Sequence, residues 1–261
     1  MTQFYAGIDI GSTHAKVVII NESHDIVYHG LSKNKGNPIE TIQYLIKKGR
    51  KKNHIRKRHL SVSKTGHFAK NINTDHDYLS EMKCLAAGAR LICPDVRTII
   101  DIGSFTNKVI LLDESGKIFD YQRNDICSSG SGIFLELISK SLDVNIEQLP
   151  DLVRSSENPE HITSQCSIFA ESEVIYLMNE GRKIADIAKG CCQSIVGRIV
   201  PLVQRLNPIE PMIMTGGVSK NMAVYQLLEQ SLGLIFQQYS FDPQFVVAYG
   251  CAFLSKERRE G

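Results

Sequence analysis

The sequence lacks any long apolar run and any strong excess of one charge. No stretch approaches the length of a membrane span, and the first residues lack the charged-then-apolar profile of a secretion signal. The formal net charge is only +2, so global electrostatics favour neither a nucleic acid nor an anionic membrane as a partner. We therefore expect a cytoplasmic protein with no nucleic-acid partner and no membrane partner.

Paired cysteine spacings are also lacking. The seven cysteines are an odd number and do not describe the disulfide framework of a small secreted domain. No histidine stands at zinc-finger spacing from a cysteine. In a reducing compartment these side chains are thiols, and some of them can ligate a metal. Five lie in apolar contexts or in a vicinal pair, and we expect them to serve packing: Cys84, Cys93, Cys191, Cys192 and Cys251.

Charge is unevenly distributed in one segment, residues 47–59, which reads KKGRKKNHIRKRH. One interpretation is a docking patch for an acidic partner or a polyanion. The other is a solvated helix end and loop ahead of a strand at residues 60–62. We favour the second, because runs of like charge are usually just exposed.

The sequence does contain an internal repeat. Residues 7–20 read GIDIGSTHAKVVII, and residues 100–112 read IDIGSFTNKVILL. In both copies an aspartate, Asp9 or Asp101, stands two residues before a Gly-Ser pair and seven before a lysine. A repeat of this kind predicts a duplicated α/β fold.

Each copy is expected to form a strand, a tight turn and a second strand. Gly11 permits backbone angles that a Cβ would forbid, so the amides after the turn can point at an anion. Ser12 and Thr13 add hydroxyl donors, and Lys16 adds a positive charge. An aspartate at the end of the first strand suits Mg²⁺ held through water. The alternative is two plain hairpins whose Asp-Ile-Gly only makes the bend, but the duplication favours phosphate binding.

Glycine turns recur where strands meet helices. Apolar residues at helical spacing predict helices at residues 39–48, 79–89, 133–142, 167–178, 193–206 and 222–232. A strand at residues 212–214 runs into Gly216-Gly217, and Gly130-Ser131-Gly132 opens the helix at residues 133–142. Such turns allow a nucleotide to approach the backbone closely. In a duplicated α/β chain they favour nucleotide binding.

Two further stretches are more specific: residues 124–135, NDICSSGSGIFL, and residues 164–175, SQCSIFAESEVI. With the repeat, they make the chain resemble the BadF/BadG/BcrA/BcrD ATPase family and its activators of 2-hydroxyacyl-CoA dehydratases, from Gly7 to about Phe253. The resemblance implies an α/β fold of duplicated ribonuclease H-like lobes, as in the actin-like ATPase superfamily, with a nucleotide cleft between them. We expect an N-terminal ATPase lobe at residues 1–96 and a C-terminal lobe with the cluster cysteines at residues 97–261.

The resemblance also implies site residues. Cys127 and Cys166 match the cysteines that ligate a 4Fe–4S cluster in the family. Asp9 and Asp101 match the aspartates of its two phosphate motifs and are expected to be catalytic. ATP or ADP with Mg²⁺ is expected to be bound by Gly11, Ser12, Thr13, Lys16, Gly103, Ser104, Gly130, Ser131, Gly132, Gly216, Gly217 and Asn221.

The chemistry around the two matched cysteines agrees with this implication. Each stands just before a predicted amphipathic helix, whose amide dipoles stabilise a thiolate. A cubane needs four cysteine ligands, whereas this chain offers two in matched contexts. One cluster on the two-fold axis of a homodimer would receive two cysteines from each chain and so have its four ligands. The alternative is that Cys127 and Cys166 are small buried residues that cap helices.

Two segments depart from the family pattern. Where the second phosphate motif usually reads Asp-Ile-Gly-Gly-Gln-Asp, residues 101–106 read DIGSFT, so Phe105 and Thr106 replace a Gln and an Asp that could orient water or metal. The family's Thr-Gly-Tyr-Gly-Arg segment is altered to KTGHF at residues 64–68. Nucleotide binding should survive these changes, whereas hydrolysis should be affected.

The function that the resemblance implies is an ATP-dependent electron-transfer activator. A ferredoxin or flavodoxin would reduce the cluster, and the homodimer would pass one low-potential electron to a partner dehydratase or reductase. A small-molecule kinase of the same superfamily is the first alternative. The second is a non-catalytic nucleotide-binding regulator, which the change at Phe105 and Thr106 suggests.

Overall fold

The computed structural model describes residues 2–34, 36–124, 131–163 and 166–260, and the chain divides into two compact units. Unit 1 comprises Met1–Val96, Leu112–Ile118 and Tyr239–Gly261, and unit 2 comprises Arg97–Leu111 and Phe119–Gln238. The end of the chain therefore returns to the N-terminal unit, whereas the expected lobes were continuous in sequence. The assignment of an ATPase function to each lobe stays a prediction.

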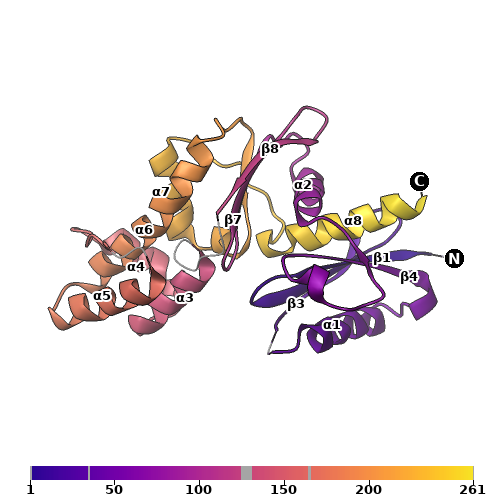
Figure 1. Ribbon diagram of the computed structural model, residues 1–261, viewed down its shortest axis with the longest axis horizontal. Helices are drawn as coiled ribbons and strands as arrows, with labels where there is room; N and C mark the ends of the chain where they lie inside the picture. Colours follow the sequence, from indigo (N-terminus) through magenta and orange to yellow (C-terminus); the bar gives the residue numbers. More distant parts are fainter. Residues whose placement is uncertain (1, 35, 125–130, 164–165, 261) are drawn as a thin grey trace. The chain divides into compact units, whose positions relative to one another are not determined.

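Unit 1 is built on a five-stranded mixed sheet in the order β3-β2-β1-β4-β5 (Figure 1). The strands are β1 (Phe4–Ile10), β2 (His14–Ile20), β3 (Ile26–Lys33), β4 (Leu60–Thr65) and β5 (Asp77–Tyr78). The helices are α1 (Pro38–Lys52), α2 (Glu81–Ile92) and α8 (Val246–Glu260), with short 3₁₀ turns η1 (Lys57–His59), η2 (Ala69–Asn71) and η6 (Pro243–Phe245). β1 runs antiparallel to β2 and parallel to β4.

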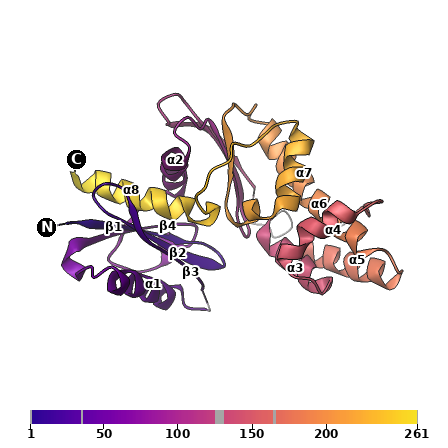
Figure 2. The same ribbon diagram turned by 180° about the vertical axis from the view of Figure 1, so that it is seen from behind.

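Both faces of this sheet are covered, which explains why its central strands are almost continuously apolar. Figures 1 and 2 show α1 on one face and α8 on the other. Because successive side chains of a strand point to opposite faces, each strand supplies two cores. The core on the α1 face contains Ala6, Ile8, Ile10, Val17, Ile19, Ile42 and Leu45. The core on the α8 face contains Tyr5, Val18, Ile20, Ala248 and Ala252.

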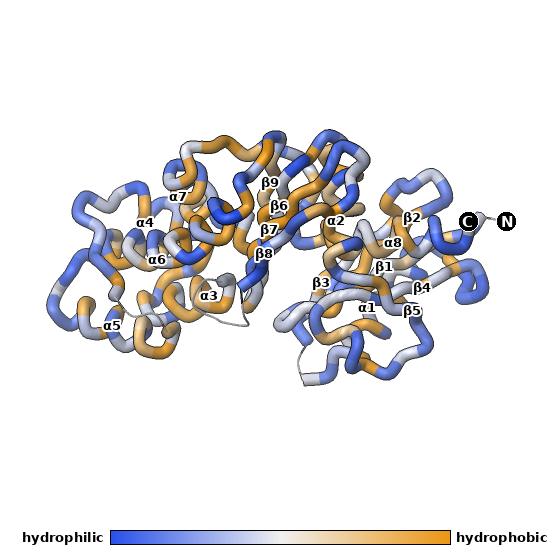
Figure 3. Tube along the Cα trace, turned by 45° about the horizontal axis from the view of Figure 1, so that its top comes forward, coloured by the Kyte–Doolittle hydropathy of each residue, from blue (hydrophilic) through white to orange (hydrophobic). Residues whose placement is uncertain are grey.

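Unit 2 contains a four-stranded sheet in the order β8-β7-β6-β9. Its strands are β6 (Thr98–Ile102), β7 (Asn107–Leu112), β8 (Ile118–Arg123) and β9 (Met212–Thr215). Figure 3 shows the hydrophobic colour along β6 and β7, whereas β8 at the sheet edge is mostly hydrophilic. The helices are α3 (Gly132–Ser141), α4 (Leu149–Ser155), α5 (Ser167–Asn179), α6 (Ile184–Gln204) and α7 (Met222–Leu232), with 3₁₀ turns η4 (Ile146–Gln148) and η5 (Gly217–Lys220).

The predicted hairpins and most predicted helices are confirmed. One helix was placed wrongly: α6 begins at Ile184, nine residues before the predicted start. Gly190 obscures the pattern there, and it is a glycine because a Cβ would lie 1.9 Å from the carbonyl oxygen of Glu160. Helices α4 and α8 were not predicted. Within the described ranges, none of the helices combines the length and the apolarity needed to cross a membrane.

Candidate functional site

The first repeat forms the hairpin β1–β2, in which Asp9 and Lys16 stand directly opposite each other. The Lys16 Nζ lies 2.8 Å from Oδ2 of Asp9. The turn is closed by the Gly11 amide, which donates to the carbonyl oxygen of His14 at 3.1 Å. Only 7% of the Asp9 side chain is exposed, and a buried carboxylate needs a charged or hydrogen-bonding partner. The spacing of seven residues therefore serves to neutralise the aspartate.

Asn34, just after β3, forms two hydrogen bonds to this turn. Its Nδ2 donates to the carbonyl oxygen of Gly11 at 2.9 Å, and its amide donates to that of Thr13 at 3.0 Å. The Oδ1 of Asn34 is buried and accepts no hydrogen bond from any part of the chain that the structure describes. No local sequence pattern indicated Asn34, because its contact with the turn depends on how β3 pairs with β2.

Gly66, which follows β4, lies against the aspartate of the first hairpin. β4 runs parallel to β1 and pairs Thr65 with Asp9. Gly66 has a φ of +105°, and a Cβ there would lie 2.6 Å from Oδ1 of Asp9. The segment in which the sequence departs from the family pattern thus borders Asp9 and keeps the glycine that permits this approach. The altered residues His67 and Phe68 follow that glycine.

The second repeat forms the hairpin β6–β7 with the same plan. Asp101 stands opposite Lys108, whose Nζ lies 3.1 Å from its Oδ2. The Gly103 amide donates to the carbonyl oxygen of Thr106 at 3.0 Å and closes the turn that contains Phe105. A further bond, which sequence reasoning missed, runs from Oγ1 of Thr215 to Oδ1 of Asp101 at 2.9 Å.

The glycine-containing segments of unit 2 come together at the carboxyl ends of β6 and β9. The Gly132 amide donates to the carbonyl oxygen of Gly103 at 2.9 Å, and Oγ of Ser131 donates to that of Ser104 at 2.6 Å. Gly216 has a φ of +86°, and a Cβ there would lie 2.3 Å from the carbonyl oxygen of Ile102. Gly130 lies outside the described residues.

Gly217 and Asn221 bracket the turn η5 after β9. Gly217 is its first residue, and Asn221 is the N-cap of α7. The Oδ1 of Asn221 accepts from the amides of Ala223 and Val224 at 3.1 and 3.2 Å. This cap explains the asparagine by itself. Its predicted contact with nucleotide, like those of Ser12, Thr13 and the other loop residues, stays a prediction.

The cysteines fall into two classes. Five are buried, as predicted: Cys84, Cys93, Cys191, Cys192 and Cys251. Burial raises the pKa of Cys192 to about 12 and raises the pKa of Cys191 as well, so these thiols remain protonated. Cys166 is exposed and is the N-cap of α5, where its carbonyl oxygen accepts from the Ala170 amide at 2.9 Å. Cys127 lies outside the described residues.

The position of Cys166 fits a cluster ligand. Cys166 is exposed at the N-terminus of α5, so its sulfur is accessible to a metal cluster. Over the described ranges, no three histidine, cysteine or acidic side chains gather into a group that could hold a metal ion. Cys166 can therefore supply one ligand, and a cluster held here would take its other ligands from elsewhere.

Helix α5 carries apolar side chains on opposite sides. Ala170 and Val174 are fully buried in the core of unit 2. On the other side, Ile168 is 68% and Phe169 is 69% exposed, and Ile175 and Tyr176 are exposed as well. A helix that is apolar all round is normally covered on all sides. The exposed set begins two residues after Cys166, so the apolar surface adjoins that thiol.

The chain matches the BadF/BadG/BcrA/BcrD ATPase family over residues 6–255. It is 34% identical over 239 residues to the (R)-2-hydroxyglutaryl-CoA dehydratase activating ATPase of Acidaminococcus fermentans, and this region is 90% of each chain. The solved activator of the 2-hydroxyisocaproyl-CoA dehydratase from Clostridium difficile, with bound ADPNP, superimposes with a TM-score of 0.90 at 32% identity. That match covers 99% of this chain and 97% of the activator.

A more distant likeness concerns the fold alone. A ROK family glucokinase from Streptomyces griseus superimposes with a TM-score of 0.56 at 13% identity, over 97% of this chain and 99% of the kinase. Together with the activator structure, it confirms the predicted fold class of the actin-like ATPases and sugar kinases.

Proposed function

Because the chain belongs to the BadF/BadG/BcrA/BcrD ATPase family, we propose that it is an ATP-dependent activator that delivers one low-potential electron to a partner dehydratase or reductase. The observation that carries this proposal is the pair of matched Asp–Lys hairpins in a chain with a single exposed cysteine among the described ones. The names of the relatives, activators of acyl-CoA dehydratases, support the partner class.

ATP or ADP with Mg²⁺ is the proposed ligand of the hairpin loops. The backbone amides at Ser12 and Thr13 are proposed to bind phosphate oxygens without charged side chains. The Ser131–Gly132 turn, whose Gly132 amide donates to Gly103, is proposed to let the nucleotide approach the backbone closely. Among the residues that the structure describes, only Lys16 bonds to the Asp9 carboxylate, which leaves Oδ1 to accept from a water molecule on Mg²⁺. The ADPNP in the Clostridium difficile activator supports a nucleotide as the ligand.

Cys127 and Cys166 are the proposed ligands of a 4Fe–4S cluster that two copies of the chain share. When bound, such a cluster supplies a one-electron carrier of low potential. A second copy would bring two further thiolates and would cover the apolar side of α5 beside Cys166. A ferredoxin or flavodoxin is the proposed electron donor.

Coupling of nucleotide binding to electron transfer requires that the nucleotide makes different contacts in two conformations of the protein. ATP and ADP differ in the γ-phosphate, which the residues proposed to hold Mg²⁺ and water would contact. We propose that Asp9, whose Oδ1 accepts no bond within the described part of the chain, senses that difference. Phe105 and Thr106 have no carboxylate or amide with which to orient the attacking water, so we expect slow turnover.

The test is an anaerobic sample, reduced with dithionite and followed by electron paramagnetic resonance with and without Mg²⁺-ATP. The proposal predicts a spectrum of a reduced cluster that changes when Mg²⁺-ATP is added, and no change for Asp9→Asn. A cluster spectrum that is insensitive to nucleotide would contradict the coupling.

Two other functions are separated by simple assays. A small-molecule kinase would phosphorylate an organic acceptor and would keep full activity in the iron-free protein. A non-catalytic regulator, which the change at Phe105 and Thr106 suggests, would bind ATP without releasing phosphate under any condition.

A further inference from the structure

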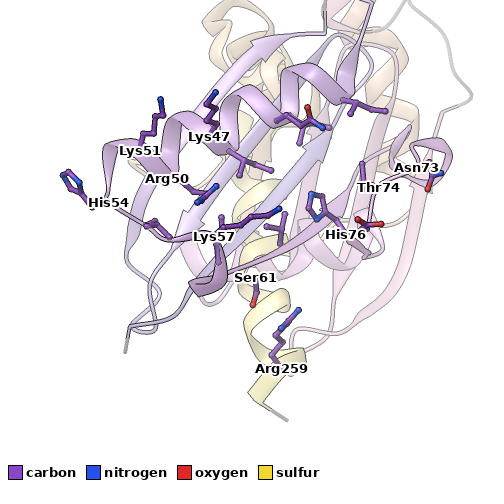
Figure 4. A pocket seen from close by; sticks show the side chains of 18 residues that line it. Lys47, Arg50, Lys51, His54, Lys57, Ser61, Asn73, Thr74, His76 and Arg259 are labelled. Atoms are coloured by element: carbon purple, nitrogen blue, oxygen red, sulfur yellow. The ribbon is translucent and has the colours of Figure 1, made fainter.

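A large cavity lies in unit 1, away from the hairpin turn of β1 and β2. It has a volume of about 1110 Å³ and lies between α1, η1, β4 and the segment that precedes β5 (Figure 4). This is the region of the basic run at residues 47–59, for which the activator function offers no role. As the favoured interpretation predicted, the run forms the exposed end of α1 and the turn η1 ahead of β4, and part of it also lines this cavity.

The charges around this cavity are strongly one-sided. Five cationic side chains line it: Lys47, Arg50, Lys51, Lys57 and Arg259. Asp75 is the one acidic residue in the lining. Figure 4 shows Arg50 from α1, Lys57 from η1 and His76 directed into the same space. Clustered cations of one sign raise the local concentration of an anion.

Two polar atoms of lining residues have no hydrogen-bond partner among the residues that the structure describes. Nε of Arg50 and Oγ1 of Thr74 are buried, and neither bonds to any group in the described part of the chain. Most buried polar atoms in folded proteins are paired, so these two are unusual, and both belong to residues that line the cavity. A guanidinium N–H and a hydroxyl can both donate to the oxygens of a phosphate or carboxylate.

The electrostatics at His76 agree with an excess of positive charge around the cavity. Burial lowers the pKa of His76, and the positive charges of Lys64 and Lys57 lower it further, against the opposing effect of Asp75 and Asp77. An anion bound beside the imidazole would favour its protonated form and raise this pKa.

The lining also contains apolar side chains. Ile46, Leu60 and Val62 are partly buried side chains that pack on the core of unit 1 and also line the cavity, together with the buried Ile42 and Ile55. Pockets for small molecules commonly combine an apolar wall with a few polar groups that fix orientation. A bare inorganic ion would leave this wall uncovered.

We propose that this cavity binds a small organic anion, with an apolar body against Ile46, Leu60 and Val62 and a phosphate or carboxylate at Arg50, Lys57 and Thr74. The site is separate from the hairpin loops and does not depend on the proposed electron transfer.

The test uses 1-naphthyl phosphate as a fluorescent probe, added to the full-length protein with saturating Mg²⁺-ADP so that the nucleotide site is occupied. The proposal predicts saturable binding that Mg²⁺-ADP does not displace. Two controls should each bind at least about tenfold more weakly. Inorganic phosphate lacks the apolar body and would leave the apolar wall uncovered. 1-Naphthol lacks the charge and would not form the charge-assisted hydrogen bond. Equal binding of either control would overturn the proposal.

Substitutions of single cationic residues test whether the probe binds in this cavity. Arg50→Gln should weaken binding of 1-naphthyl phosphate about tenfold, the loss of one charge-assisted hydrogen bond. The matched control is Arg56→Gln, which removes one charge from the same basic run but outside the cavity and should change binding less than about twofold. Lys57→Gln alters an exposed side chain, so it tests the site even if Arg50→Gln fails to fold. Equal effects of Arg50→Gln and Arg56→Gln, or no effect of Lys57→Gln, would contradict the assignment.

Discussion

The hairpins β1–β2 and β6–β7 follow one plan, but their aspartates are bound differently. In each, the aspartate pairs with a lysine on the next strand and with a threonine on a parallel strand, and a glycine with positive φ follows that threonine. In unit 1, Oγ1 of Thr65 donates to the carbonyl oxygen of Leu79 at 2.8 Å. In unit 2, Oγ1 of Thr215 donates to Asp101 itself at 2.9 Å.

This difference indicates separate roles for the two aspartates, one in ligand binding and the other in stability. Both oxygens of Asp101 are engaged, one by Lys108 and one by Thr215, whereas Oδ1 of Asp9 accepts no bond from the residues that the structure describes. The second ion pair is also the more buried, since 8% of the Lys108 side chain is exposed against 17% for Lys16. We therefore expect Asp9 to contribute more to Mg²⁺-nucleotide binding and Asp101 more to stability.

The largest expected effect is on stability. Asp101→Ala removes the carboxylate of a buried ion pair with Lys108 and should lower the free energy of unfolding by about 3–5 kcal/mol. Asp9→Ala should cost less, because Lys16 can reach water. Urea unfolding of both variants measures the difference. The double variant Asp101→Ala/Lys108→Met should recover part of the loss, and equal losses for the two single variants would remove the distinction between the hairpins.

The second effect concerns Mg²⁺. Asp9→Asn should weaken the binding of Mg²⁺-ADP about tenfold, an assumed loss of one charge-assisted interaction, while binding of ADP without Mg²⁺ changes little. Asp101→Asn is the matched control and should leave the Mg²⁺ dependence nearly as it is. Isothermal titration with and without Mg²⁺ gives both values. A larger effect at Asp101 would mean that the open oxygen of Asp9 is not used.

The two threonines allow a finer test. Thr215→Val removes a hydrogen bond to a carboxylate and should cost about 1.5–3 kcal/mol, whereas Thr65→Val removes a bond to a carbonyl and should cost about 0.5–1.5 kcal/mol. Thermal and urea unfolding of the two variants, compared with the unchanged protein, give these values. The reverse order would show that the bond to Asp101 contributes little.

The smallest effect is expected at the turn of the second hairpin. The double variant Phe105→Gln/Thr106→Asp supplies an amide and a carboxylate that could orient water, so ATP turnover should rise severalfold while ADP affinity stays constant. Phosphate release under single-turnover conditions measures this. No gain would indicate that another step limits the rate.

The sequence predicted the two hairpins but not the difference between their aspartates. The repeated Asp, Gly-Ser and Lys lie close together in the chain, so the local pattern was sufficient to predict both hairpins. Thr215 is far from Asp101 in sequence and meets it only because β9 pairs with β6. The same holds for Asn34 and for the return of α8 to unit 1, since strand and helix packing between distant segments leaves no local periodicity.

The cavity beside the basic run illustrates the same limit. The charges at residues 47–59 were visible in the sequence, but the apolar wall and Thr74 come from other segments. The charge run therefore predicted the exposed helix end, which the structure has, but not the cavity beside it.

The central claim, an activator with a cluster shared between two copies, is tested most directly by iron content. Protein purified without oxygen should contain about four irons per two chains, by the stoichiometry of a 4Fe–4S cubane, and should elute as a dimer. Cys127→Ser and Cys166→Ser should each abolish the iron, while the buried control Cys84→Ser should retain it. A Cys127→Ser/Cys166→Ser double variant that keeps its iron, or a monomer with four irons, would contradict the account.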